Sequence, residues 1–188
     1  NTAYVNIITG ESITFGSSMN APYSVPGSPW VFGPLAEEPT AMAVADLRTM
    51  DTRPLAEVGG ANFPPNAGMI MSEPAEDGTV AVMFAGVPSY SAPGKLLLLG
   101  DSFADARWIT LPEPFTSVSE VSLSPNGTYA VVTSSADNAQ GALSHRYGLI
   151  DITNDSVIAV FPEITTIGEP STAWSWIRGG QALAYLDG

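Results

Sequence analysis

Four short turns recur along the chain at nearly equal spacing, and this spacing constrains the fold more than any other feature. Each turn contains a glycine and precedes an apolar run. The glycines are Gly27, Gly78, Gly127 and Gly180, separated by 51, 49 and 53 residues. Because a glycine-containing turn beside an alternating apolar run is typical of a β-hairpin, we expect a strand after each turn. A repeat of about fifty residues is long enough for one four-stranded antiparallel sheet.

The clearest copy of the turn is Leu123–Thr133, in which Ser-Pro-Asn-Gly leads into a β-branched, alternating run. Proline, asparagine and glycine favour a tight turn, and the residues after them favour a strand. Related copies cover Pro74–Phe84 and Trp176–Tyr185, and a fainter one covers Val25–Phe32. The repeat therefore extends over most of the chain.

A second signature falls between these turns and predicts a second hairpin in each repeat. It consists of a strand, an Asn or Asp, an apolar residue and a polar turn, and its copies are Ala3–Glu11, Ala43–Asp51 and Gly148–Ser156. Asn6, Asp46 and Asp151 occupy the same place in these copies. We expect the side chain there to bond the backbone of the following turn. Lys95–Leu99, followed by Gly100-Asp101-Ser102, is a looser copy.

The segment Thr40–Arg53 allows two interpretations. Ala43, Leu47 and Met50 are spaced as on one face of a helix, between two prolines. The same residues also match the strand-and-turn signature of the other copies. We favour the strand for that reason.

The Ser-Pro-Asn-Gly turn and the strand after it resemble the TolB-type, WD40-like (PD40) β-propeller repeat. Trp174–Tyr185 resembles the same motif, with Arg178-Gly179-Gly180 in place of Pro-Asp-Gly. The chain lacks Trp-Asp and Gly-His pairs, which argues against the WD40 adaptor family itself. The resemblance implies an all-β propeller or partial propeller with about three full four-stranded blades and two half blades. The expected ranges are 1–16 (half), 17–60, 61–113, 114–163 and 164–188 (half).

The two half blades leave two arrangements open. They can pair to complete one blade, which gives about four blades in all, or the remaining blades can lie on another chain. We favour the partial propeller. An open blade face would be apolar, so this arrangement predicts that another protein surface covers Trp174, Trp176 and their neighbours. The chain begins at Asn1 with neither an initiator methionine nor a basic signal region, so we expect a processed chain or a fragment.

The charge balance excludes several classes of partner. Only 6 Lys and Arg face 19 Asp and Glu, giving a net charge of −13, and Lys95 is the single lysine. Nucleic acids and anionic membranes are recognised by clustered basic residues, so neither is an expected partner. The longest clear apolar run, Leu96–Leu99, is too short to span a membrane. Few charges, many small polar residues and the Asn-x-Ser/Thr sites at Asn126 and Asn154 favour an exported protein.

The sequence predicts neither a catalytic residue nor a cofactor. The one histidine, His145, lies between Ser144 and Arg146, and we expect it in a solvated loop. Cysteine and the Gly-x-Ser-x-Gly nucleophile motif are both absent. Metal binding would have to use oxygen ligands, for which the candidate calcium pairs are Asp101 with Asp105 and Asp151 with Asp155. These aspartates lack the spacing of a calcium-binding loop, so we interpret them as solvated turn acids.

Aromatic residues and loops are the candidate contact surface. We expect Trp30, and at least one of Trp174 and Trp176, to pack in the core. The candidate partner-binding residues are Tyr90, Trp108, Trp174 and Trp176, with Tyr90 in the proline-containing loop Val87–Pro93.

Together these features predict a non-enzymatic, exported propeller that binds a protein or anchors an assembly, with a basic or neutral partner favoured by its acidity. One alternative is the substrate-gating propeller of a multidomain serine hydrolase or peptidase. Another is a glycan-binding propeller.

Overall fold

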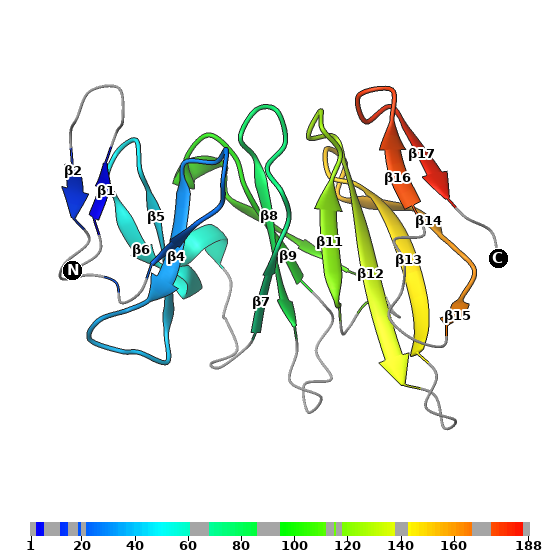
Figure 1. Cartoon of the computed structure of the whole chain (residues 1–188), viewed down its shortest axis with the longest axis horizontal. Helices are drawn as coiled ribbons and strands as arrows, with labels where there is room; N and C mark the ends of the chain where they lie inside the picture. The colour runs from blue at the N-terminus through cyan, green and yellow to red at the C-terminus, as the bar shows by residue number, and fades with distance from the viewer. Residues whose placement is uncertain are drawn as a thin grey trace. The chain divides into compact units, whose positions relative to one another are not determined.

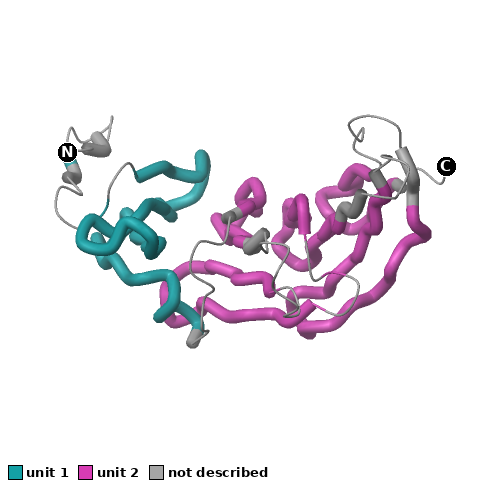
Figure 2. The backbone as a smooth tube through the Cα atoms, turned by 90° about the horizontal axis from the view of Figure 1, so that it is seen from below, with its two compact units in different colours: residues 1–66 teal, residues 67–188 magenta. Residues whose placement is uncertain are grey.

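The chain is built from β-strands, as Figure 1 shows. This computed structural model describes residues 3–5, 12–14, 19, 22–60, 68–85, 95–111, 115, 118–137, 143–166 and 174–185. In these ranges the helices are two short 3-10 segments, and none is an α-helix. The predicted all-β class is therefore confirmed. The chain divides into two compact units, Asn1–Asn66 and Ala67–Gly188, coloured separately in Figure 2.

The first unit contains one hairpin and one four-stranded antiparallel sheet. The hairpin pairs β1 (Ala3–Val5) with β2 (Ser12–Thr14). The sheet follows chain order through β3 (Tyr23–Ser24), β4 (Trp30–Pro34), β5 (Met42–Asp46) and β6 (Thr52–Pro54), and the 3-10 helix η1 (Leu55–Gly60) comes next. Trp30 is fully buried, which confirms its predicted core role.

Strands β5 and β6 decide between the two interpretations of Thr40–Arg53. The helical alternative is wrong, because β5 pairs with β4 on one side and with β6 on the other. Ala43 and Ala45 lie opposite Gly33 and Val31, and both alanines are buried with Val31 in one apolar cluster. Pairing on both edges of the strand overrides the helical spacing of its apolar residues.

In its described residues, the second unit contains a four-stranded sheet, a five-stranded sheet and a hairpin, all antiparallel. The first sheet runs in chain order through β7 (Gly68–Met71), β8 (Val80–Ala85), β9 (Lys95–Leu99) and β10 (Arg107–Thr110), with the 3-10 helix η2 (Phe103–Asp105) between β9 and β10. The second runs through β11 (Glu120–Leu123), β12 (Tyr129–Asp137), β13 (Leu143–Asp151) and β14 (Ser156–Val160). Strand β15 (Ile164–Thr166) pairs with the start of β13, and β16 (Trp174–Ile177) pairs with β17 (Ala182–Tyr185).

Every sheet except one lies inside one of the five ranges given by the repeat; the exception is the sheet of β11–β14, whose fifth strand β15 falls in the range 164–188. The assignment of those ranges to blades remains a prediction.

The sheets of the second unit pack face to face in chain order. Strand β12 shows this most clearly, because alternate side chains of a strand point to opposite faces. Ala130 and Val132 join the apolar cluster shared with Leu96 and Leu98 of the preceding sheet. Val131 points the other way, into a second cluster with Tyr147 and Trp174. The middle sheet is therefore covered on both faces by its neighbours in the chain.

Trp174 and Trp176 belong to the second of these clusters. Trp174 is only 9% exposed, and the ring of Trp176 lies edge-on to it with centroids 6.1 Å apart. Trp176 Nε1 donates a hydrogen bond to Ser122 Oγ of β11 at 3.2 Å. The predicted core role of these tryptophans is confirmed. Trp174 does not need another protein to cover it, because β12 and β13 of the same chain cover it. The expectation that another protein covers Trp176 and its neighbours stays a prediction.

His145 also differs from expectation. It lies within β13 and is 1% exposed, so the predicted solvated loop is wrong. The reason is that β13 is nine residues long and is flanked at this point by two strands. His145 lies opposite Ser135 of β12 and Ile164 of β15.

The four repeated turns have the backbone geometry that the sequence predicts. Their glycines, Gly27, Gly78, Gly127 and Gly180, have φ values of 82°, 83°, 67° and 86°. Residues with a Cβ rarely adopt these angles, which explains the glycine in each copy. A strand begins within three residues of each glycine, so the predicted succession of turn and strand is confirmed.

In the second unit the turns also pack one on the next. The amide of Glu76 donates to the carbonyl of Pro125 at 2.8 Å, which joins two successive turns. A Cβ on Gly127 would lie 3.3 Å from Asp77 Oδ2, and one on Gly180 would lie 2.9 Å from Asn126 Oδ1. Each glycine therefore also makes room for the side chains of the preceding turn.

Candidate functional site

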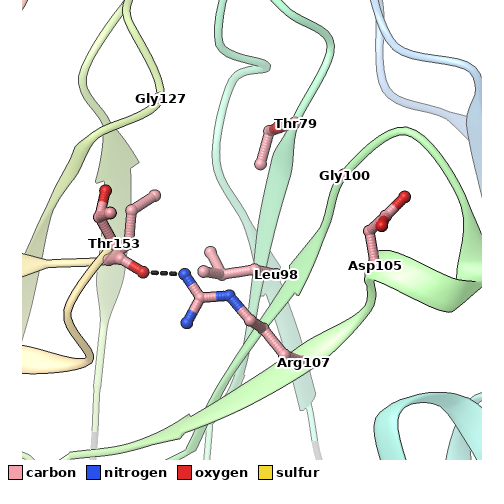
Figure 3. A pocket seen from close by; sticks show the side chains of 8 residues that line it. Thr79, Leu98, Gly100, Asp105, Arg107, Gly127 and Thr153 are labelled. Carbon is pink, nitrogen blue, oxygen red and sulfur yellow. Dashed lines mark hydrogen bonds between the residues drawn. The ribbon is translucent and has the colours of Figure 1, made fainter.

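A cleft of about 470 Å³ opens in the second unit, between the sheet β7–β10 and the sheet β11–β14. Figure 3 shows it with Thr153 at the left, Asp105 at the right, and Leu98 and Arg107 between them. Its volume falls in the range of roughly 300–1,000 Å³ that small-molecule sites occupy. The lining residues are Thr79, Leu98, Gly100, Asp105, Arg107, Gly127, Ile152 and Thr153.

Two buried aliphatic side chains give the cleft an apolar part. Leu98 of β9 is 4% exposed and Ile152, just after β13, is 3% exposed. Both belong to the apolar cluster between the two sheets. Gly127 adds backbone without a side chain, because the preceding turn occupies the space of a Cβ there. The same packing that joins the sheets thus forms this apolar lining.

Arg107 ties the two sheets together at the cleft. It stands at the start of β10, and its Nη1 donates to Asp155 Oδ1 in the turn between β13 and β14. Its Nη2 donates to the carbonyl of Ile152, the hydrogen bond drawn in Figure 3. The planar guanidinium suits this double contact because its donors are held in a fixed fork. The charge of Arg107 is therefore compensated within the protein.

Asp105 is the acidic residue of the cleft lining. It ends η2, whose first turn is capped by Ser102, since Ser102 Oγ accepts from the amide of Ala104 at 3.2 Å. The same hydroxyl donates to Asp105 Oδ2 at 2.7 Å. This local bond fixes the carboxylate, while Asp105 itself stays exposed to solvent.

Thr79 and Thr153 each follow an aspartate by two residues, and the aspartates fix their backbones. The amide of Thr79 donates to Asp77 Oδ1 at 2.9 Å, and that of Thr153 donates to Asp151 Oδ1 at 2.9 Å. Both are Asx turns, and the one at Asp151 is the turn that the sequence predicts. Asp46 does the same for the amide of Arg48, at 2.9 Å, whereas Asn6 lies outside the described residues.

Asn154 lowers the pKa of Asp151. Its side-chain amide donates to Asp151 Oδ2 at 2.8 Å, and this hydrogen bond is the main cause. The backbone amides of Asn154 and Thr153 lower the pKa further, because all three donors stabilise the ionised carboxylate. The turn beside the cleft therefore carries an aspartate held in its charged form.

The lining combines two hydroxyls, one carboxylate and one compensated guanidinium with an apolar part. Hydroxyl and carboxylate oxygens can accept hydrogen bonds from a ligand, and the apolar part can take hydrocarbon. This chemistry suits reversible recognition. The histidine of the chain lies elsewhere, within β13.

The structure distributes the calcium candidates between the cleft and its border. Asp105 lines the cleft, Asp155 holds Arg107, and Asp151 accepts three hydrogen bonds in its turn. Asp101 is exposed just before η2. Within the described ranges, no group of three or more His, Cys, Asp or Glu side chains is arranged to hold a metal ion. Calcium binding stays a prediction.

The candidate partner-binding residues are not brought together at the cleft. Trp108 is half-buried in β10, and Trp174 and Trp176 of β16 pack against the apolar cluster with β12 and β13. Tyr90 lies outside the described residues. The partner-binding role of all four stays a prediction.

Sequence reasoning missed Arg107, Thr79 and Thr153 as site residues. The threonines carried a usable signal, since each follows an Asx turn of the repeat. Arg107 carried none, because its partner Asp155 lies 48 residues away.

In the part of the chain that the structure describes, no helix is long and apolar enough to cross a membrane. No protein-family model matches the chain, and no curated protein shows significant similarity to it.

Proposed function

We propose that this chain is a non-enzymatic, exported β-propeller, complete or partial, that binds another protein. The arrangement of its sheets supports the fold. Two four-stranded sheets follow chain order, as do strands β11 to β14 of the five-stranded sheet, and the sheets of the second unit stack face to face with the hairpin β16–β17. Sequential meanders that bury both faces against their neighbours are what propeller blades require.

The single observation that carries the binding function is the cleft between two of these sheets. Its walls are rigid, because Arg107 and two Asx turns fix the residues that line it. A polar rim on an apolar lining, placed on a rigid framework, is the arrangement that recognition sites use. The proposed binding function therefore rests on turn residues that the packed sheets hold in place.

Strand β14 offers a second surface that supports protein binding. It forms an outer edge of its sheet, and Ile158 and Val160 are exposed on it. No proline or charged residue interrupts Ser156–Val160. Outer strands β6 and β10, in contrast, contain Arg53 with Pro54 and Arg107. Exposed apolar edges without such protection are common contact surfaces.

The charge distribution favours a basic or neutral partner. The chain has 19 acidic residues and 6 basic ones. Among the described residues, four arginines already form ion pairs with Asp46, Asp51, Asp155 and Glu163. The excess negative charge is thus left to attract cationic groups. Export is supported by the glycosylation-type sites, whose asparagines, Asn126 and Asn154, lie at exposed turns.

A peptide array tests the proposed function. The full chain is applied to arrays of random peptides graded by net charge and, in parallel, to a glycan array. We expect binding to basic and neutral peptides and intact recovery of those peptides. Binding to glycans alone would favour the glycan-binding alternative, and cleavage of the peptides would contradict the non-enzymatic proposal. Silence on every array would overturn the binding function.

A further inference from the structure

We propose that the cleft accepts the cationic side chain of a lysine or arginine from the partner. This inference rests on the proposed protein-binding function and names the group that the cleft recognises. It draws on three properties of the lining: its apolar part, its hydrogen-bond acceptors and its charge.

The apolar part of the cleft suits the stem of a long basic side chain. Leu98 and Ile152 are almost fully buried yet line the cavity. Lysine and arginine carry several methylene groups that pack on apolar surface while the charged head stays near water. A short polar ligand would leave this hydrocarbon lining without a counterpart.

The polar rim suits the charged head. Asp105, Thr79 and Thr153 all line the cleft, and their side chains carry one carboxylate and two hydroxyl groups. An ammonium group has three donors and a guanidinium has five, and neither can accept. Acceptors are therefore what such a head requires, and hydrogen bonds between charged groups are stronger than neutral ones.

The local charge favours a cation despite the presence of Arg107. Asp155 compensates that guanidinium, and the carbonyl of Ile152 accepts from its second nitrogen. The carboxylate of Asp105 is bonded to the neutral hydroxyl of Ser102, so its negative charge stays available. Asp77, beside Gly127, adds a second negative charge close to the lining. A carboxylate ligand would be repelled by this arrangement.

Two small probes, one with and one without a terminal ammonium group, test the inference. The full chain, labelled with 15N, is titrated with N-acetyl-lysine methylamide and with N-acetyl-norleucine methylamide, whose stem ends in a methyl group. We expect the lysine probe to shift the amide signals of Thr79, Gly127 and Thr153 and to bind roughly three- to tenfold more tightly than the norleucine probe. Equal affinity for both probes would overturn the inference.

Two variants, each of which removes one negative charge, show which charge contributes to binding of the lysine probe. Asp105→Asn keeps an acceptor for Ser102 but removes the charge, and we expect it to weaken the lysine probe roughly three- to tenfold. Asp101→Asn makes the same charge change outside the lining, and we expect less than about a twofold effect because solvent and salt screen it. If both variants weakened binding of the lysine probe equally, the overall negative charge of the chain would account for the binding, and the inference would be overturned. Binding of peptides on the array without shifts at the cleft would overturn this inference alone.

Discussion

At the scale of single residues, the turn between β16 and β17 separates two reasons for glycine. Gly179 and Gly180 both have positive φ values, of 62° and 86°. A Cβ on Gly179 would meet nothing within 4 Å, whereas one on Gly180 would lie 2.9 Å from both Asn126 Oδ1 and Ser124 Cβ. Only Gly180 therefore serves backbone conformation and packing together.

Replacing these two glycines by alanine should separate the two effects. We expect Gly179→Ala to lower the free energy of unfolding by about 1–2 kcal/mol, the cost of a left-handed conformation. Gly180→Ala should cost about 1–3 kcal/mol more, because the preceding turn must also move. Urea unfolding of both variants measures the difference. Equal costs would show that the two turns do not pack as described.

Gly148 of β13 depends on packing alone. Its Cβ would lie 2.7 Å from Phe115 Cζ, inside the cluster between the two sheets. We expect Gly148→Ala to destabilise the fold by about 1–3 kcal/mol through overpacking. In a Phe115→Leu background the same substitution should cost clearly less. A thermal or urea double-mutant cycle checks this coupling, and strict additivity would contradict it.

At the scale of elements, the turns after β5 and β13, each the third strand of its sheet, share one design. Asp46 ends β5 and Asp151 ends β13, and each bonds the amide two residues later. Four residues after each aspartate, Met50 and Asp155 have φ values of 63° and 52°. Two segments far apart in the sequence thus form the same kind of turn, each with an aspartate at the same position.

The pKa of Asp151 reports directly on this turn. We expect Asn154→Ala to raise this pKa towards the ordinary value of 3.8, because its strongest stabilising hydrogen bond is lost. Thr153→Ala keeps the backbone amide and should leave the pKa nearly unchanged. Titration of the Asp151 carboxyl carbon by NMR, on protein without glycan, measures both. An unchanged pKa in Asn154→Ala would contradict the role of its side chain.

The same hydrogen bonds fix the sign of the pH dependence. The folded pKa of Asp151 lies below its unfolded value, so the bonds stabilise the fold at pH values above the unfolded pKa. This contribution disappears as the pH falls through the folded pKa. Asn154→Ala should therefore lose less stability on acidification than the parent chain.

Local chemistry explains which elements could be predicted from the sequence. The turn glycines, the strands after them and the Asx turns depend on residues a few positions apart. His145 was misplaced because Ser144 and Arg146 suggest a loop, while its burial depends on pairing with β12 and β15. The cleft was missed for a similar reason, since Arg107 and Asp155 are joined only once two sheets have packed.

At the scale of the whole molecule, electrostatic repulsion opposes the fold. The net charge is −13, and the four ion pairs described above are solvent-exposed apart from Asp46. Exposed pairs contribute only about 0–1 kcal/mol each, so they do not offset repulsion among many acids. Screening by salt should then stabilise the chain.

Thermal unfolding at increasing sodium chloride concentration tests this balance. We expect Tm to rise between low ionic strength and about 0.15 M, where the Debye length falls to about 8 Å. A neutral osmolyte at matched osmolality controls for effects unrelated to charge. A fall in Tm with salt would mean that the ion pairs outweigh the repulsion.

The packing of turn on turn gives the stack of sheets a direction. Along the second unit, the earlier turn contributes side chains and the later turn contributes a bare glycine to receive them. The turn before β12 makes both kinds of contact, because its Gly127 lies against Asp77 of the preceding turn while its Ser124 and Asn126 lie against Gly180 of the next one. A duplicated copy of this sheet and its turn, inserted in the same orientation, would pack against both neighbouring turns. Gene duplication can therefore add sheets to this fold without changing the residues by which one turn packs on the next.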